Sequence, residues 1–338
     1  MHARGVTKHF DSVMAVEGID LTVKIGTVHG IVGPNGAGKT TVLSMIFGLT
    51  TPDSGVLRVL DQPTARHDGR TVDGVAGCVE MPRFYPYLSA RRNLALLAGL
   101  DGAASRSVVA RKVDEVLWQV GLGTVSGDRV REYSLGMRQR LGIAAALLRD
   151  VRLLVLDEPS NGLDLAGVQE VRALLTSLAQ QGVAVLLSSH HIKELEEVCD
   201  AVTILRAGHV VFDGSMQQMR RRAPDPQFRL HSSDDVAAQL VAERGDQITL
   251  ESGDDQPGFA VRTSQQGLDA YVMQLVRLGI AIRGLQPVRS PLESLFLELT
   301  TSEPHVAATA GESPTGQQAL SMSASTGEAG HESLGVRR

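Results

Sequence analysis

Residues 33–40 read Gly33-Pro34-Asn35-Gly36-Ala37-Gly38-Lys39-Thr40 and fit the pattern G-x-x-x-x-G-K-[ST]. The apolar run at 26–32 before them is typical of a buried strand. The apolar residues after them recur at helical spacing, at Val42, Leu43, Ile46 and Leu49. Glycines let successive backbone N–H groups face phosphate oxygens, and the start of a helix adds partial positive charge. The segment therefore predicts a phosphate-binding loop between a strand and a helix.

Two side chains of this loop are predicted to act on a bound nucleoside triphosphate. Lys39 would bring a point charge to the β and γ phosphates, and the Thr40 hydroxyl would ligate Mg²⁺. The predicted nucleotide contacts comprise every residue from Gly33 to Thr40 together with the following Thr41.

A second apolar run, residues 153–156, ends in two acids, Asp157 and Glu158, followed by Pro159. In open α/β sheets, ligands bind beyond the carboxyl ends of the strands. We expect Asp157 to hold Mg²⁺, through water, and Glu158 to orient or deprotonate an attacking water. Solvated charges at a strand end are the alternative, and the phosphate loop elsewhere in the chain makes the catalytic interpretation preferable.

Strand-like and helix-like segments alternate through residues 1–222, which predicts an α/β domain with a mainly parallel sheet. Compact Val/Leu runs at 152–156 and 183–189 are typical of central parallel strands. Residues of about 81–150 are mostly helical in pattern, so we expect a helical subdomain there. Trp118 in this stretch is expected to be a core or half-buried anchor.

The texture changes at Ala223-Pro224-Asp225-Pro226, because paired prolines resist both helix and sheet. The segments that follow read strand 227–231, helix 234–244, strand 247–251, strand 258–263, helix 266–278 and strand 280–286. The order β-α-β-β-α-β predicts a small ferredoxin-like α+β domain at 223–300. Tyr271 is expected to be an anchor of its core. A last helix is expected to begin at Ser290-Pro291-Leu292-Glu293, a capping box with an apolar face behind it.

Residues 301–338 contain no Ile and no aromatic residue, and Ser, Thr, Gly and Ala dominate. Such a composition buries too little apolar surface to offset the entropy of ordering the chain. We expect a disordered tail.

Overall composition restricts the class of protein. The net charge is −5 in 338 residues, which gives no general basic footprint for nucleic acid. Cys78 and Cys199 form no C-x-x-C pair, and reduced thiols in the cytoplasm are expected. No apolar run approaches the ~18–20 residues that span a bilayer, and the N-terminus lacks a signal-peptide pattern. We expect a cytoplasmic protein.

Three further segments make the chain resemble the ABC ATPases. Residues 133–140, Tyr-Ser-Leu-Gly-Met-Arg-Gln-Arg, resemble the LSGGQ signature of that family. Residues 160–164 resemble its D-loop, and Ser188-Ser189-His190 resembles its switch-histidine segment. Phe10 matches the aromatic residue that stacks on adenine. The motifs span residues 1–220 in the family's order.

The resemblance implies ATP with Mg²⁺ as the bound nucleotide and a head-to-tail pair of ATPase subunits, expected to be a homodimer. Ser134 and Gly136 of one subunit would close on the γ-phosphate held by the other subunit's Lys39. His190 would join Glu158 and Lys39 in catalysis. A hydroxyl and a backbone N–H at a helix start suit an anion, although Ser134 could equally be an ordinary helix cap.

The signature departs from the usual pattern at Leu135 and Met137, as in the branch of bacitracin, lantibiotic and multidrug exporters. Glu80 stands where the family's Q-loop usually has glutamine, and we expect it to approach the metal. The resemblance implies a separate transmembrane permease, against which residues 83–97 would move, and thus a peripheral position on the inner face of the cell membrane.

The expected function is to power export of a drug or antimicrobial peptide by ATP hydrolysis. Another transported cargo, a soluble ABC ATPase acting on ribosomes or DNA, and an ATP-binding regulator are the alternatives. A single ATPase cassette without a long coiled coil argues against the second of these, and the presence of Glu158 and His190 argues against the third.

Overall fold

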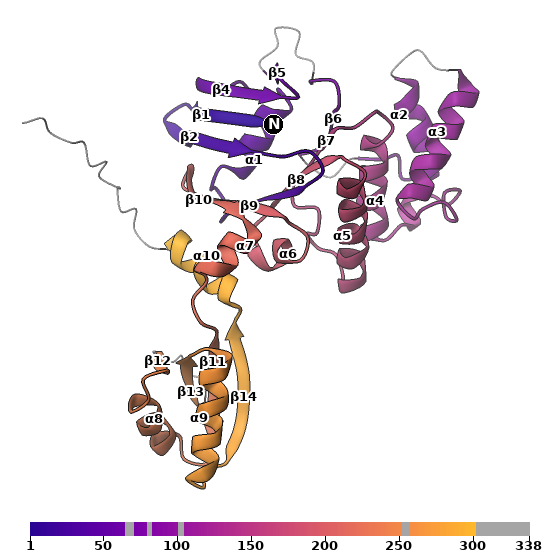
Figure 1. Ribbon diagram of the computed structural model, residues 1–338. Coiled ribbons are helices and arrows are strands. Elements are labelled where there is room, and N and C mark those ends of the chain that lie inside the picture. The colour runs from indigo at the N-terminus through magenta and orange to yellow at the C-terminus, as the bar shows by residue number, and fades with distance from the viewer. Residues whose placement is uncertain (65–70, 80–82, 101–104, 252–256, 302–338) are drawn as a thin grey trace, which may run out of the picture. The chain divides into compact units, whose positions relative to one another are not determined.

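The structure is a computed structural model that describes residues 1–64, 71–79, 83–100, 105–251 and 257–301. Its largest sheet has six strands in the order β10-β9-β3-β8-β7-β6 (Figure 1). Five of them are parallel and β10 is antiparallel to β9. Their bounds are β3 Val28–Val32, β6 Val75–Cys78, β7 Leu153–Leu156, β8 Ala184–Ser189, β9 Ala201–Arg206 and β10 His209–Ser215. The predicted α/β class with a mainly parallel core is confirmed.

The central strands β3, β7 and β8 are buried along their whole length because both faces of the sheet are covered. Alternate residues of a strand point to opposite faces. Leu153 and Val155 accordingly belong to one apolar core, whereas Leu154 and Leu156 belong to another. This arrangement explains why these strands read as continuous apolar runs rather than as an alternating pattern.

A second sheet, antiparallel and four-stranded, covers one of these faces together with α1 (Lys39–Ile46). Its order is β2-β1-β4-β5, with β1 His2–Phe10, β2 Val13–Thr22, β4 Ser54–Val59 and β5 Gln62–Pro63. The other face packs against α5 (Leu165–Gln180), α6 (Ile192–Glu196) and α7 (Met216–Arg222).

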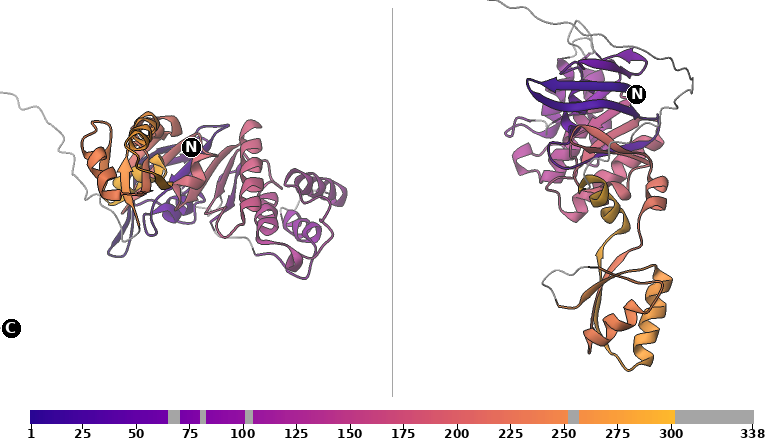
Figure 2. Two further views of the ribbon diagram at one scale, coloured as in Figure 1. Left: turned by 90° about the horizontal axis from the view of Figure 1, so that it is seen from below. Right: turned by 90° about the vertical axis from the view of Figure 1, so that its left-hand side faces the viewer.

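Helices α2 (Ala90–Gly99), α3 (Arg106–Gln119) and α4 (Leu135–Ala146) form the helical region, with the short 3-10 helix η1 (Val130–Glu132) before α4. Figures 1 and 2 show α2 and α3 beyond α4, away from β9 and β10. Apolar residues at helical spacing on α3, Val113, Val116 and Leu117, are all buried, as their spacing predicts.

The chain continues into a small α+β unit whose sheet has the order β12-β13-β11-β14, antiparallel throughout. Its elements are β11 Gln227–Ser232, α8 Asp235–Glu243, β12 Thr249–Glu251, β13 Phe259–Arg262, α9 Gln265–Arg277 and β14 Ile282–Arg289. Both the order β-α-β-β-α-β and the ferredoxin-like strand arrangement agree with the prediction. Leu230, Phe259, Val261, Tyr271 and Leu275 form a core of its own.

The last helix, α10 (Pro291–Thr301), differs from the expected division of the chain. Its apolar residues Leu292 and Leu295 are buried in the core that contains α5, α6 and α7, rather than in the core of the small unit. Of the predicted accessory domain at 223–300, the part after Arg289 therefore packs on the larger α/β part.

In the part of the chain that the structure describes, each helix is too short or too polar to span a bilayer. The predicted tail, apart from Thr301 at the end of α10, lies outside the described residues.

Candidate functional site

A cavity of about 350 Å³ opens at the loop between β3 and α1. It is lined by the loop residues 35–41, by Val13, Met14 and Ala15 of β2, and by Asp157 and Glu158. The loop lies so close to its neighbours that glycine is required at two positions. A Cβ on Gly33 would lie 2.3 Å from the carbonyl oxygen of Leu205, and one on Gly38, where φ is +101°, would lie 2.6 Å from that of Ala15.

The Lys39 side chain points back across the loop toward its first two residues. It is 7% exposed and donates to the carbonyl oxygens of Gly33 at 2.7 Å and Pro34 at 3.3 Å. Its Nζ also lies 3.7 Å from a carboxylate oxygen of Glu158. A desolvated ammonium held by neutral carbonyls and one carboxylate is well placed to exchange these partners for phosphate oxygens.

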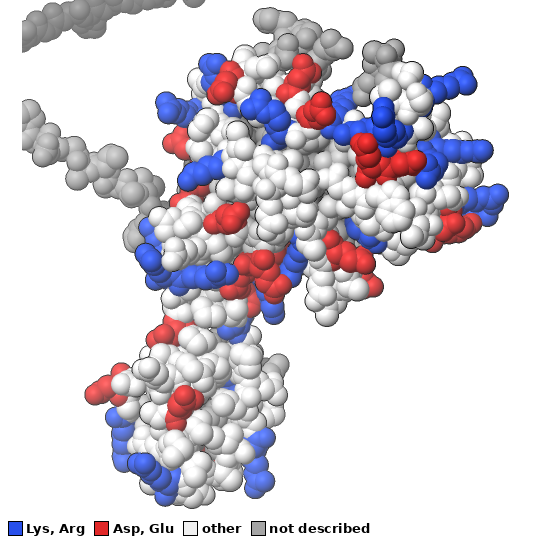
Figure 3. Space-filling view, turned by 45° about the vertical axis from the view of Figure 1, so that its right-hand side comes forward, with Lys and Arg blue, Asp and Glu red and all other residues white. Residues whose placement is uncertain are grey.

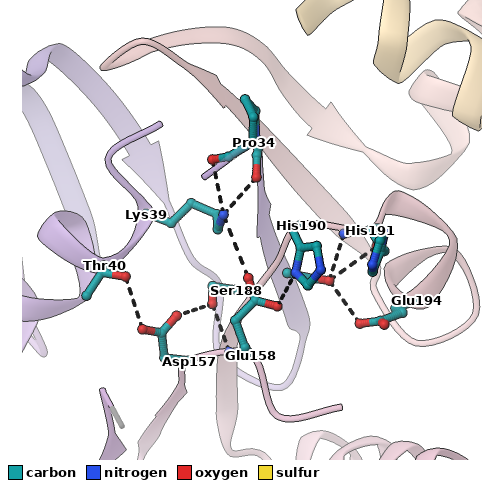
Figure 4. A network of polar contacts seen from close by, with 11 residues as sticks. Pro34, Lys39, Thr40, Asp157, Glu158, Ser188, His190, His191 and Glu194 are labelled. Carbon is teal, nitrogen blue, oxygen red and sulfur yellow. Dashed lines mark hydrogen bonds and ion pairs between the residues drawn. The ribbon is translucent and has the colours of Figure 1, made fainter. Parts of the chain in front are cut away.

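Asp157, the residue after β7, connects the loop with the neighbouring strand β8 (Figure 4). One carboxylate oxygen accepts from the Thr40 hydroxyl at 3.1 Å, and the other accepts from the Ser188 hydroxyl. A hydroxyl oxygen and a carboxylate oxygen this close to each other can both bind one Mg²⁺, which prefers oxygen ligands.

Glu158 has a left-handed backbone, with φ of +48°, which is uncommon for a residue with a side chain. Its N–H donates to the Ser188 hydroxyl at 2.9 Å, so β8 stabilises this conformation. The turn aims the carboxylate at two cationic or potentially cationic groups. One oxygen lies near Lys39, and the other lies 2.8 Å from Nδ1 of His190.

His190 follows β8, which is paired in parallel with β7, Leu156 lying opposite Leu187. Because parallel strands end at the same sheet edge, the residues after β7 and after β8 meet there. The arrangement can polarise a water next to a bound phosphate, with Glu158 accepting a proton and His190 orienting the carboxylate.

Cys78, the last residue of β6, lies at the same edge, where its carbonyl accepts from the Asp157 N–H at 3.1 Å. Burial, reinforced by the charge of Asp157, raises the pKa of its thiol to about 11. The thiol is therefore neutral at pH 7 and acts as a packing group beside the acid pair.

Not every predicted residue lines the cavity. Phe10 is 48% exposed at the end of β1, with the Lys8 ammonium 5.4 Å from its ring centre, and the cavity wall there comes from Val13 and Met14 instead. Ser134 caps α4, accepting from the Met137 N–H at 3.2 Å, and Gly136 lies in the first turn of that helix. Neither residue lines the cavity of its own chain. Glu80 lies outside the described residues.

Sequence reasoning missed Ser188 and the part of the cavity wall that β2 supplies. Ser188 ties Asp157 and Glu158 together, and its signal was a hydroxyl inside a buried apolar strand, where it must find a partner. Met14 lines the cavity from a strand edge, and no local pattern marks it.

The chain is similar to known proteins over most of its length. A family model described as ABC transporter matches residues 16–161. The uncharacterized ABC transporter ATP-binding protein YdbJ of Bacillus subtilis (strain 168) is 33% identical over 303 residues, covering 89% of this chain and 96% of that protein. The bacitracin transport ATP-binding protein BcrA of Enterococcus faecalis is 31% identical over 307 residues, covering 88% and 96%.

A solved structure of an ATP-binding subunit of an ABC transporter superposes with a TM-score of 0.57 at 25% identity, covering 65% of this chain and 92% of that one. The similarity to YdbJ and BcrA extends over nearly the whole of those proteins. The chain therefore belongs to the ATP-binding proteins of ABC transporters, the subunits that bind and hydrolyse ATP.

Proposed function

We propose that this chain hydrolyses Mg-ATP at the loop cavity and thereby drives export of a drug or antimicrobial peptide through a separate transmembrane subunit. The observation that carries the hydrolytic part is the position of Glu158, whose carboxylate lies between the ammonium of Lys39 and the imidazole of His190. The relative BcrA, whose name assigns it to bacitracin transport, supports the export part, since the similarity continues through the small C-terminal unit.

In the proposed reaction, the γ-phosphate takes the place of the Gly33 and Pro34 carbonyls as the partner of Lys39. Negative charge on the phosphate then competes with Glu158 for the ammonium, which frees that carboxylate to accept a proton from water. His190 holds the other oxygen of Glu158, so the carboxylate keeps its direction while its charge changes.

Mg²⁺ would be held by Thr40 and Asp157, and Glu80 is the third proposed contact. The ion would neutralise charge on the phosphates. A Mg²⁺ titration of ATPase activity tests this. We expect Glu80→Ala to require more Mg²⁺ and Glu80→Gln to need little more than the wild type. Identical metal dependence in all three proteins would remove Glu80 from the site.

A second copy of the chain is the proposed source of Ser134 and Gly136 at each phosphate. The signature helix supports this, because Leu135 at its first position is 36% exposed and Leu165 at the start of α5 is 75% exposed. Apolar side chains at two neighbouring helix starts favour burial against a partner.

The proposed permease site is a groove of about 340 Å³ lined by Phe47, β6 and apolar residues of α2 and α4. Leu97 and Leu100 at its rim are 39% and 82% exposed.

On the face shown in Figure 3, acidic and basic side chains are interspersed, without a continuous basic stripe that would track a nucleic-acid backbone.

Purification of the tagged chain from its native membrane, followed by sequencing of untagged proteins, tests this assignment. We expect a transmembrane subunit to co-purify, and to be lost when Leu97 and Leu100 are both changed to Asp. Leu278→Asp, at a site 59% exposed on the small unit, is the matched control and should retain it. ATP-dependent uptake of labelled bacitracin into inverted vesicles then tests the cargo, and active ATPase without any peptide or drug uptake would contradict the export function.

A further inference from the structure

The position of His190 depends on the start of helix α6. The backbone turns between Ser189 and α6 with His191 as the residue before the helix. The Ser189 hydroxyl accepts from the His191 N–H at 3.0 Å and donates to the carboxylate of Glu194 at 2.9 Å. The rings of His190 and His191 are also in contact, with centroids 3.8 Å apart. A movement of α6 therefore moves His190.

Helix α10 packs on α6 from the other side. Ile192 and Leu195 of α6 are almost fully buried in the same core as Leu292 and Leu295 of α10, and Phe296 packs against that core. The guanidinium of Arg206 donates to the carbonyl of Leu299 at 3.2 Å and holds the end of α10 against β9. Thus α6 is joined to the catalytic turn at its start and also packs against a helix from the end of the described chain.

A cavity of about 370 Å³ separates the two histidines from α10. His190, His191 and Ile192 form one wall, and Val288, Arg289, Glu293, Phe296 and Leu297 form the other. His190 is therefore shared between this cavity and the catalytic network, since its Nδ1 lies 2.8 Å from Glu158. Atoms that line a cavity have no dispersion partners on their open side, so they are held less firmly than fully packed atoms. Small shifts of α10 can therefore change how closely the opposite wall approaches His190.

The connection from the small unit to α10 has little slack. Only Ser290 separates the end of β14 from the start of α10. Ser290 forms a reciprocal cap with Glu293, its N–H donating to the carboxylate at 3.0 Å and its hydroxyl accepting from the Glu293 N–H at 3.2 Å. Such a capping box fixes the angle at which the chain enters the helix.

We propose that α10 positions the catalytic histidine, with Phe296 as the positioning residue, so that the small unit adjusts ATP hydrolysis through β14 and α10. This rests on the proposed catalytic role of Glu158 and His190. Phe296 does not line the loop cavity; it belongs to the wall that faces the His190–His191 pair across the second cavity, and so limits the room into which that pair can move.

The test is Phe296→Ala in the full-length chain, with ATP affinity and kcat measured separately. We expect unchanged ATP affinity and about a tenfold lower kcat, within the hundredfold that a misplacement of about 1 Å can cost. Phe296→Leu refills most of the volume and should recover most of the activity. Leu299→Ala is the matched control, because Leu299 is also partly buried on α10 but does not line the cavity.

A spectroscopic readout separates positioning from general destabilisation. In protein carrying ¹³C-labelled histidine, Phe296→Ala should shift the His190 ring resonance, which is identified from its loss in His190→Ala, whereas Leu299→Ala should not. If Phe296→Ala does not fold, Leu297→Ala tests the same wall. Equal losses of kcat in the Phe296 and Leu299 variants, or an unchanged His190 resonance, would overturn the proposal. Normal kcat in His190→Ala would instead refute the catalytic assignment.

Discussion

At the level of single residues, the backbone of Glu158 is held in a left-handed conformation. A left-handed conformation costs a residue with a side chain about 1 kcal/mol or more, and here it is stabilised by the N–H bond to Ser188. The conformation turns the carboxylate away from the line of β7 and toward Lys39 and His190. The strained backbone of Glu158 therefore directs its carboxylate at these two side chains.

Replacing Glu158 with Gln should remove the proton acceptor without changing the backbone. We expect Glu158→Gln to bind ATP normally and to hydrolyse it at least about a hundredfold more slowly, the usual effect of losing a general base. Because the phosphate contacts persist, the variant should accumulate as a larger species in gel filtration with ATP and Mg²⁺. Glu243→Gln, at an exposed position on α8, is the control. Normal turnover by Glu158→Gln would assign the base to another residue.

Lys39→Ala should weaken ATP binding by about ten- to a hundredfold, since a charge-assisted phosphate contact contributes roughly 1.5–3 kcal/mol. Nucleotide titration measures the affinity, and thermal melting checks that the fold persists. Lys24→Ala, which removes an exposed charge outside the cavity, should bind like the wild type. Wild-type affinity in Lys39→Ala would refute the assignment of the phosphate loop.

The loop and acid pair could be predicted because their geometry follows from contiguous residues after a strand. The hydroxyl of Ser188 in a buried strand showed that it needs a partner, but not that Asp157 and Glu158, after the neighbouring strand, supply it. Met14 could not be assigned, because no local pattern marks it. The predicted roles of the site residues stay predictions. They comprise the nucleotide contacts of residues 33–41, Phe10, Ser134 and Gly136, the metal contacts of Thr40, Asp157 and Glu80, and the catalytic roles of Lys39, Glu158 and His190.

At the level of elements, strands buried on both faces gave the clearest signal, and β7 and β8 begin and end within about a residue of their apolar runs. Tyr271 was predicted as an anchor and is 2% exposed, its hydroxyl donating to the carbonyl of Ala238. Trp118 was predicted to be core or half-buried and is 64% exposed, with its ring close to Gly123. Helical spacing predicts which residues share a face of the helix, but not whether the Trp118 ring is covered. Here the ring lies against Gly123, which has no side chain to cover it.

Strand β3 carries a titratable group in its interior. His29 is 3% exposed, and its Nε2 lies 2.8 Å from the Thr203 hydroxyl, which donates to Asp213. Burial lowers the pKa of His29 to about 4, against a smaller opposing effect of Asp213. The unfolded chain then binds a proton that the folded chain excludes, between about pH 6.5 and pH 4.

The contribution of neutral His29 to the free energy of unfolding should therefore be complete above pH 6.5 and be lost as the pH falls toward 4. The free energy of unfolding should fall by about 3 kcal/mol over this range. Urea unfolding at pH 7, 6, 5 and 4.5 measures the dependence. His29→Gln should be less stable at pH 7 but lose stability less steeply below pH 6.5. His209→Gln, at an exposed histidine, should keep the wild-type slope. Equal slopes for wild type and His29→Gln would show that His29 titrates normally.

At the level of the whole molecule, the chain leaves the α/β part after α7 and returns to it as α10. The two helices are in contact, and both pack into the core around α5 and α6. We propose that the small unit comprises residues 223–289, rather than 223–300 as the sequence predicted. The sequence showed the amphipathic face of α10 but not which of two apolar cores would receive it.

Two truncations test this division. Ending the chain after Thr301 should leave ATPase activity and melting temperature unchanged, because the residues beyond have little apolar surface to bury. Ending it after Arg289 also removes Leu292 and Leu295, each worth about 1.5–3 kcal/mol when buried. We expect the melting temperature to fall by about 5–15 °C in that case. A clear fall with the first truncation would indicate that the tail docks, and no fall with the second would mean that α10 contributes nothing to the core.

The pairing of β11 with β14 makes the small unit exchangeable. Gln227 at its entry lies opposite Arg289 at its exit, so the two ends are separated by about the 5 Å spacing of neighbouring strands. A short Gly-containing turn could replace the unit without stretching the chain, and a foreign domain with adjacent termini could be grafted at the same point. Chimaeras with one ATPase core and different inserted domains can therefore be built by joining the new domain at these two residues.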